Sequence, residues 1–191
     1  MRKVLVHIIQ YNYRAVFKHM SAAMLLMFLV TVSASAQTTA ASEYQVKAVF
    51  LFNFTHFVDW PTSAFEYPYE PFIIGIIGND PFGSLIESTI EGERIGTHLI
   101  KINRYKTIQD IQKCHILYIA SQDPDETKKI INAVADKDIL TVGDSPNFIR
   151  WGGMIRFFKE ENKIRLQINN SAAKAAGLKI SSKLLRVAQV S

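Results

Sequence analysis

Four short apolar runs, separated by segments with helical patterning, constrain the fold of this chain most strongly. The runs cover residues 72–77 (FIIGII), 98–102 (HLIKI), 115–120 (HILYIA) and 138–143 (DILTVG). Continuous apolar runs are typical of strands that are buried on both faces, and the helical segments between them can serve as crossover connections. The sequence therefore predicts an α/β domain with a mainly parallel sheet that is flanked by helices on both faces.

The C-terminal part of the chain has a different pattern. Two strand-like segments, GMIRFF (residues 153–158) and KIRLQIN (residues 163–169), lie close together in the sequence. Two such runs with a short polar connection predict a β-hairpin. Two short helical segments, residues 170–177 and 181–190, follow the hairpin. We therefore expect the domain to end with a β-hairpin and terminal helices.

The first 36 residues have the features of a secretory signal peptide. They contain four basic and no acidic residues, an apolar run over residues 22–32, and small residues at Ala34 and Ala36. This order matches a positively charged region, a hydrophobic region and an A-x-A cleavage site. A membrane anchor is the alternative, but the run is shorter than the ~20 residues that a membrane span needs. We predict cleavage after Ala36 and a single periplasmic domain over residues 37–191 that does not insert into the membrane.

Charge and cysteine content exclude several classes of protein. The chain has 22 basic and 17 acidic residues, but four basic ones lie in the signal peptide, so residues 37–191 carry 18 basic and 17 acidic residues. A nearly neutral domain has no electrostatic footprint for nucleic acid. The single cysteine, Cys114, excludes a disulfide within the chain and is expected to be buried. A disulfide between chains and a homodimer are left open.

The stretch EYQVKAVFLFNFTHFVDWP, residues 43–61, is rich in aromatic residues and predicts an amphipathic helix. The expected core face consists of Val46, Val49, Phe50, Phe54, Phe57 and Val58. Phe52 lies about 160° from this face at roughly 100° per residue, so we expect it to be partly exposed. Exposed aromatic side chains concentrate binding energy at interfaces. Phe52 is therefore a candidate contact for a protein partner.

Three predicted strands are followed by acidic or hydroxyl residues, which can be interpreted in two ways. Asp80, Asp123 and Ser145 each precede a proline, a pattern that predicts the N-terminal cap of a helix. However, open parallel sheets bind ligands at the carboxyl ends of their strands. On that second interpretation, Asp80, Asp144 and Ser145 are the tentative ligand-binding residues.

Catalytic and metal-binding motifs are missing from the sequence. GIIGNDPFG departs from the dinucleotide and P-loop patterns, and no G-x-S-x-G motif is present. His56, His98 and His115 are not spaced as metal ligands relative to Cys114 or to a carboxylate. We predict no catalytic residues, no metal and no cofactor, and hence a protein that is not an enzyme.

Several segments in the same order resemble the YfiR/HmsC-like family of exported regulators. They are FVDWP, IGNDPFG, CHILYI, ILTVGD, GGMIRFF, NKIRLQIN and AAGLKISSKLLRVAQV. The resemblance implies an α/β domain in the periplasm that binds and represses the periplasmic part of an inner-membrane diguanylate cyclase, and so controls cyclic-di-GMP and biofilm formation. Some relatives form disulfides from cysteine pairs, a feature that does not carry over to a chain with one cysteine.

Two alternatives remain open at the level of function. The membrane partner can be a histidine kinase instead of a cyclase. The domain can also be a small-molecule binding module that uses the loops at the strand ends, either by itself or as a ligand-gated repressor.

Overall fold

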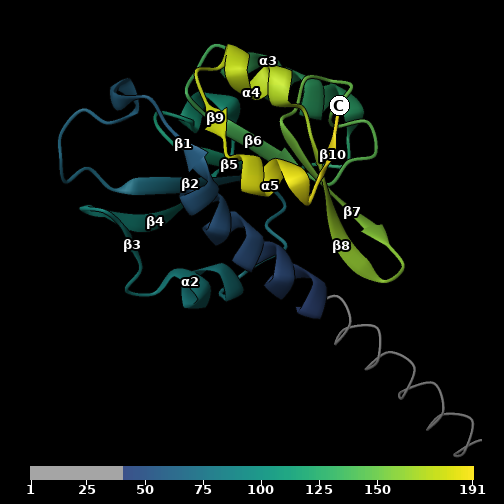
Figure 1. Cartoon of the computed structure of the whole chain (residues 1–191), viewed down its shortest axis with the longest axis horizontal. Helices are drawn as coiled ribbons and strands as arrows, with labels where there is room; N and C mark the ends of the chain where they lie inside the picture. Colours follow the sequence, from purple (N-terminus) through teal and green to yellow (C-terminus); the bar gives the residue numbers. More distant parts are fainter. Residues whose placement is uncertain (1–40) are drawn as a thin grey trace, which may run out of the picture. The chain divides into compact units, whose positions relative to one another are not determined.

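The structure, a computed structural model, describes residues 41–191. The predicted signal peptide and its cleavage site after Ala36 lie outside the described residues, so both stay predictions. Residues Glu43–Ser191 form one compact unit. Figure 1 shows its strands and helices, coloured along the sequence.

An eight-stranded sheet with the order β10-β8-β7-β6-β5-β2-β4-β3 forms the centre of this unit. Its strands are β2 (Phe72–Gly78), β3 (Arg94–Ile95), β4 (His98–Tyr105), β5 (Ile116–Ala120), β6 (Leu140–Gly143), β7 (Ile155–Glu160), β8 (Lys163–Ile168) and β10 (Gln189–Val190). Strands β4, β2, β5, β6 and β7 are mutually parallel, whereas β3–β4 and β7–β8 are antiparallel. The predicted mainly parallel sheet is therefore confirmed.

The order of the parallel strands reverses beside β2, the first of them in the chain. The next strand, β4, lies on one side of β2, and β5, β6 and β7 follow on the other side. Connections that leave in opposite directions open a crevice at the carboxyl ends of the two strands where the order changes. In this chain those strands are β2 and β5.

The helices lie on both faces of the sheet. They are the N-terminal helix (residues 41–57), α2 (Leu85–Ile90), α3 (Pro124–Val134), α4 (Asn170–Ala175) and α5 (Ser182–Arg186), with 3₁₀ turns η1 (Thr62–Ala64) and η2 (Ile108–Asp110). The N-terminal helix, in blue in Figure 1, leads into β1 (Val58–Asp59), which pairs with β9 (Lys179–Ile180) in a second, two-stranded sheet.

Two hydrophobic clusters cover the two faces, and strand β5 contributes to both. Ile116 and Tyr118 belong to the cluster that includes the N-terminal helix, α2, α4 and α5, whereas Leu117 and Ile119 belong to the cluster that includes α3. Successive side chains of a strand point to opposite faces, so a strand buried on both faces is apolar at every position. This is the physical reason for the continuous apolar run HILYIA.

The N-terminal helix packs through a different face from the one we expected. Val46 and Val49 are 42% and 45% exposed, whereas Leu51 and Phe54 are fully buried. Lys47, expected on the polar surface, is 3% exposed. The assignment of Val46 and Val49 to the core was therefore wrong. The helix is rotated because an ion pair, described below, brings Lys47 against the end of β6.

The β-hairpin is confirmed and has a two-residue turn. Glu161 and Asn162 connect β7 to β8 with φ values of 46° and 62°. Positive φ at both central residues is the geometry that best fits the right-handed twist of the flanking strands. In Figure 1 the hairpin extends beyond the rest of the sheet.

Candidate functional site

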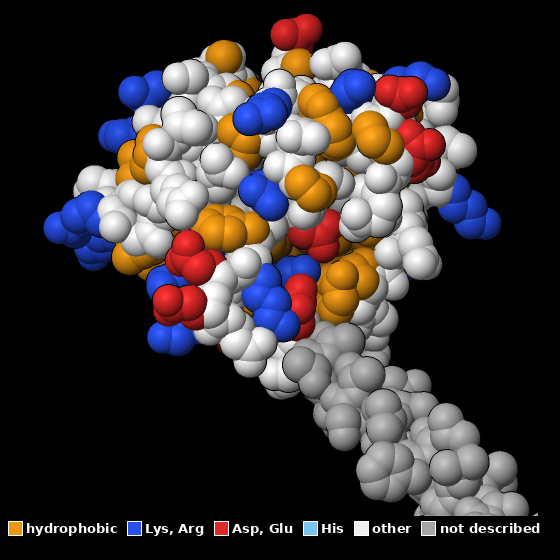
Figure 2. Space-filling model, turned by 90° about the vertical axis from the view of Figure 1, so that its right-hand side faces the viewer, with side chains coloured by type: hydrophobic (Ala, Val, Ile, Leu, Met, Phe, Trp, Pro, Cys, Tyr) orange, Lys and Arg blue, Asp and Glu red, His pale blue; other side chains and the backbone are white. Residues whose placement is uncertain are grey.

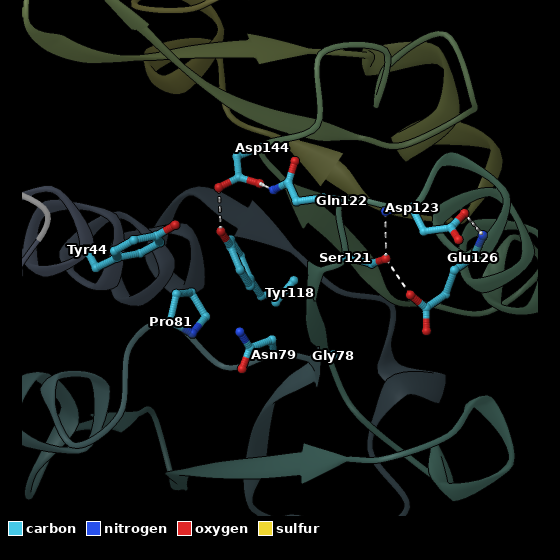
Figure 3. A pocket seen from close by; sticks show the side chains of 11 residues that line it. Tyr44, Gly78, Asn79, Pro81, Tyr118, Ser121, Gln122, Asp123, Glu126 and Asp144 are labelled. Carbon is cyan, nitrogen blue, oxygen red and sulfur yellow. Dashed lines mark hydrogen bonds between the residues drawn. The ribbon is translucent and has the colours of Figure 1, made fainter.

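A cavity of about 620 Å³ lies at the carboxyl ends of β2, β5 and β6, where the strand order reverses. Figure 3 shows it from close by. We call it the switch-point crevice and define it by its lining residues: Tyr44, Gly78, Asn79, Pro81, Tyr118, Ala120, Ser121, Gln122, Asp123, Glu126 and Asp144. It brings together the end of β2, the end of β5 and the residue after β6, with the N-terminal helix at one side.

Gly78 allows the two central strands to lie close together at the base of the crevice. Its φ is +98°, and a Cβ at this position would lie 2.7 Å from the carbonyl oxygen of Ala120. A side chain therefore has no room here, and the backbone conformation also favours glycine. The loop that begins at Asn79 leaves β2 directly beside the end of β5.

Asp80 does not line the crevice, and it does not cap a helix. Its Oδ1 accepts a hydrogen bond from the N–H of Phe82 at 2.8 Å, and its Oδ2 accepts one from Arg104 at 2.7 Å. Helix α2 begins only at Leu85, with Ser84 in the capping position. The expected cap at Asp80 was therefore wrong, because the carboxylate closes a local turn instead.

Asp123 caps α3 as expected. Its Oδ1 accepts hydrogen bonds from the N–H groups of Glu126, at 3.2 Å, and Asp125, at 2.8 Å, and Pro124 occupies the first helical position. These hydrogen bonds, led by that from Glu126, hold the pKa of Asp123 below its usual value. The first turn of α3 is thereby satisfied by the chain itself.

Ser145 is buried and does not line the crevice. Its hydroxyl donates to the carbonyl oxygen of Ser121 at 3.0 Å and so connects the end of β6 to the end of β5. Residues 146–152 form turns, so the expected helix cap at Ser145 was also wrong. Ser145 fixes the relative position of two loops that border the crevice.

Asp144 is the one of the three tentative ligand residues that lines the crevice. Its Oδ2 accepts hydrogen bonds from the ammonium group of Lys47 and from the hydroxyl of Tyr118, both at 3.1 Å. Its Oδ1 accepts one from the side-chain amide of Gln122 at 3.3 Å. Figure 3 shows the bonds from Tyr118 and Gln122 at the wall of the crevice. Asp144 thus joins the N-terminal helix to the ends of β5 and β6.

Lys47 provides the positive charge behind this wall. Its ammonium group lies 2.7 Å from Oε1 of Glu43 and 4.4 Å from the centre of the Tyr44 ring, in addition to its contact with Asp144. Burial alone would lower the pKa of Lys47, but the hydrogen bond donated to Glu43 and the charge of Asp144 outweigh it and raise that pKa. Lys47 is therefore a buried cation between two carboxylates.

Two tyrosines complete the crevice, and sequence patterns did not indicate either of them. Burial, followed by the negative charge of Asp144, raises the pKa of Tyr118, so its hydroxyl stays protonated and acts as a donor. Tyr44 presents its ring beside Pro81, as Figure 3 shows, and contacts Phe82 edge to face at 5.5 Å. The signal that could have indicated Tyr44 is its place one residue after Glu43 and three before Lys47, on the same helical surface.

Histidine and cysteine side chains lie in structural positions away from the crevice. His115 is 1% exposed; its Nδ1 accepts from the N–H of Ile73 at 3.0 Å, and its Nε2 lies 3.1 Å from the carbonyl oxygen of Ala64. Burial lowers the pKa of His115 to about 4 and raises the pKa of Cys114 to about 12. Within residues 41–191, no group of three or more His, Cys, Asp or Glu residues is placed to hold a metal ion.

A second surface lies on the outward side of the N-terminal helix. Val46, Val49, Phe52 and His56, spaced three or four residues apart, form what we call the outer ridge. Phe52 is half-buried, as its angle on the helix predicted, and contacts His56 edge to face at 5.1 Å. Its role in partner contact stays a prediction. Figure 2 shows another face of the molecule, where apolar side chains are interspersed with charges of both signs.

Comparison with protein-family models decides the relationship of this chain. The model of the YfiR/HmsC-like family matches residues 44–189. The chain belongs to the YfiR/HmsC-like family. The match begins at Tyr44 in the N-terminal helix and ends at Gln189 in β10, so it contains the whole central sheet. No curated protein sequence matches the chain.

Membership of the YfiR/HmsC-like family fits a regulatory, non-catalytic protein of the periplasm. Across the described part of the chain, no helix is both long and apolar enough to cross a membrane. The switch-point crevice and the outer ridge are the two surfaces of this YfiR/HmsC-like domain that can carry a function.

Proposed function

We propose that this YfiR/HmsC-like protein is exported to the periplasm, where it binds the periplasmic part of an inner-membrane diguanylate cyclase and holds the cyclase inactive. Release of the cyclase would raise cyclic-di-GMP and promote biofilm formation. The family match over residues 44–189 carries this proposal. The signal peptide predicted for residues 1–36 supports the location.

The outer ridge is the proposed contact surface for the cyclase. Val46 and Val49 expose nearly half of their side chains on a helix whose other side is anchored in the core by Leu51 and Phe54. Apolar side chains that a rigid helix presents to solvent are suited to binding a protein partner. Phe52, which is half-buried beside them, can contribute an aromatic contact.

Site-specific crosslinking in intact cell envelopes tests the contact. A photo-reactive amino acid at position 49 should give an adduct with an inner-membrane diguanylate cyclase, identified by mass spectrometry. The matched control is the same amino acid at Lys129, which is exposed on α3, against the other face of the sheet. An adduct with a histidine kinase would support the alternative partner. Identical adducts from positions 49 and 129, or no membrane sensor at either, would overturn the proposed surface.

Two substitutions test the repression itself. Val49→Asp and Phe52→Ala should raise cyclic-di-GMP in cells, because each weakens an apolar contact, Phe52→Ala by about 1–3 kcal/mol. The matched control is Lys129→Ala, which should leave cyclic-di-GMP unchanged. Protein level and melting temperature are measured for each variant. If cyclic-di-GMP rises only where the protein level falls, the ridge has a structural role and the proposed contact is wrong.

A further inference from the structure

The switch-point crevice has the position and the size of a ligand site. It lies at the carboxyl ends of parallel strands where their order reverses, which is where open α/β sheets bind small molecules. Its volume of about 620 Å³ falls within the range of small-molecule sites. Its groups come from separate parts of the chain: Tyr44 from the N-terminal helix, Gln122 after β5, and Asp144 after β6. The chemistry of these groups indicates which ligand fits.

Backbone N–H groups around the crevice are engaged by the chain itself. The N–H of Asn79 donates to the carbonyl oxygen of Ala120 at 3.3 Å, and that of Phe82 donates to Asp80. The N–H groups of Asp125 and Glu126, at the start of α3, donate to the carboxylate of Asp123. Sites for phosphate at such crevices use free N–H groups of this kind. This arrangement therefore disfavours an anionic ligand.

The charges that line the crevice point the same way. Asp123, Glu126 and Asp144 contribute three carboxylates, and none of the described lining residues is Lys or Arg. The nearest cation, Lys47, is already held between Glu43 and Asp144. The local charge is therefore negative, which favours a positively charged ligand.

An apolar wall stands beside these carboxylates. The Tyr44 ring and Pro81 border the crevice, and Figure 3 shows both close to Tyr118. Lys47 already lies over the ring of Tyr44, so the face of this aromatic ring is accessible to a cation. One oxygen of Glu126 accepts from the hydroxyl of Ser121, and Figure 3 shows the other pointing away from that bond.

We propose that the switch-point crevice binds a small organic cation, an amine attached to a flat apolar body. The amine interacts with the carboxylates of Asp144 and Glu126, and the apolar body packs on Tyr44 and Pro81. The binding does not depend on a cyclase partner, so it can be tested on the isolated protein. The cation replaces water at carboxylates that no cation of the lining neutralises.

Three probes with the same ring and different charge test this proposal: benzylamine, benzyl alcohol and benzoate. Each is titrated into isotope-labelled purified protein, and amide chemical shifts are followed by NMR. Benzylamine should shift the amide signals of Asn79, Gln122 and Asp144 in a saturable way. Benzyl alcohol should bind more weakly, by roughly fivefold, because it lacks one partly exposed charge interaction. Benzoate should leave these signals unchanged.

Two variants assign the charge requirement to the crevice. Asp144→Asn and Glu126→Gln should each weaken benzylamine binding by roughly threefold to fivefold. The matched control is Asp136→Asn, an exposed acidic residue after α3 that does not line the crevice, and it should bind like wild type. Glu126→Gln is the second test because Asp144→Asn also weakens the contact with Lys47.

Several outcomes would overturn the proposal. They are equal shifts with all three probes, no shift at Asn79 and Gln122 with benzylamine, and unchanged benzylamine affinity in both variants. Stronger binding of benzoate than of benzylamine would assign the opposite charge to the ligand. None of these results bears on the outer ridge, because repression of a cyclase is measured in cells with independent variants.

Discussion

Lys47 is 3% exposed, and its ammonium group contacts carboxylates from two different elements. Breaking a buried ion pair from one side is costly because the remaining charge is left without a partner. We expect a double-mutant cycle of Lys47→Met and Asp144→Asn to give a coupling energy of about 2 kcal/mol in urea unfolding. Methionine keeps the length of the side chain, so packing changes little.

An exposed ion pair of the same chain serves as the control for this cycle. Lys128 and Asp125 lie 3.2 Å apart on the surface of α3, three residues apart in sequence. Their coupling should stay below about 0.5 kcal/mol, because water screens both charges. Equal coupling energies for the two pairs would show that burial adds nothing to the Lys47–Asp144 contact.

His115 makes stability depend on pH. Burial lowers its pKa from 6.5 in the unfolded chain to about 4 in the folded protein, while the nearby charges of Glu70, Lys113 and His98 have smaller effects. Between these values the unfolded chain binds the extra proton, so stability is full above pH 6.5 and falls as the pH drops toward 4. The difference amounts to about 3 kcal/mol in the free energy of unfolding.

Urea unfolding at a series of pH values measures this effect. His115→Asn is the matched variant, because its amide oxygen can accept the N–H of Ile73 but does not titrate. The variant should be less stable at neutral pH and should lose less stability between pH 6.5 and 4 than wild type. Parallel pH curves for the two proteins would assign the acid sensitivity to other groups.

Among the elements, the N-terminal helix shows how far its own sequence determines its packing. The period of its apolar residues predicted a helix correctly, but Val46, Val49, Leu51 and Phe54 are spread over most of the circumference. Such a helix has more than one apolar face, so periodicity alone does not select the buried one. The position of Lys47 opposite Asp144 is a tertiary contact across 97 residues, which local patterns do not contain.

The buried and exposed sides of this helix predict opposite effects of truncation. Leu51→Ala should destabilise the protein by about 3 kcal/mol, since Leu51 is fully buried and its truncation leaves a cavity. Val49→Ala should change the free energy of unfolding by less than about 0.5 kcal/mol, since Val49 is 45% exposed. Urea denaturation of both variants gives the comparison. The reverse order would restore the core face expected from the sequence.

At the scale of the whole molecule, the α/β class, the parallel sheet and the hairpin could be predicted because strand and helix periods are local properties. The crevice could be predicted only in part. Asp144 follows a strand and was identified, but Tyr44 and Tyr118 enter the site through the strand order and the docking of the N-terminal helix. Asp80 and Ser145 have the same sequence context as Asp144, and only tertiary contacts distinguish them.

Asp144 connects three elements, and this predicts a local effect of its loss. It holds Lys47 of the N-terminal helix, Tyr118 of β5 and Gln122 after β5. In Asp144→Asn, backbone amides of residues 48–54 should exchange with solvent roughly fivefold faster, which corresponds to about 1 kcal/mol of local stability. The helix can open at this end without unfolding the sheet, so amides of β5 should be affected less.

Hydrogen exchange followed by mass spectrometry measures this difference segment by segment. Asp80→Asn is the control, because it weakens a contact with Arg104 on the far side of the β2 loop and does not touch the helix. Its N-terminal helix should exchange like wild type. If Asp144→Asn accelerated exchange in the helix and in β5 to the same extent, the whole domain would be opening as one unit. The Lys47–Asp144 contact would then stabilise the sheet as much as the helix, and a ligand at Asp144 could not act on the helix alone.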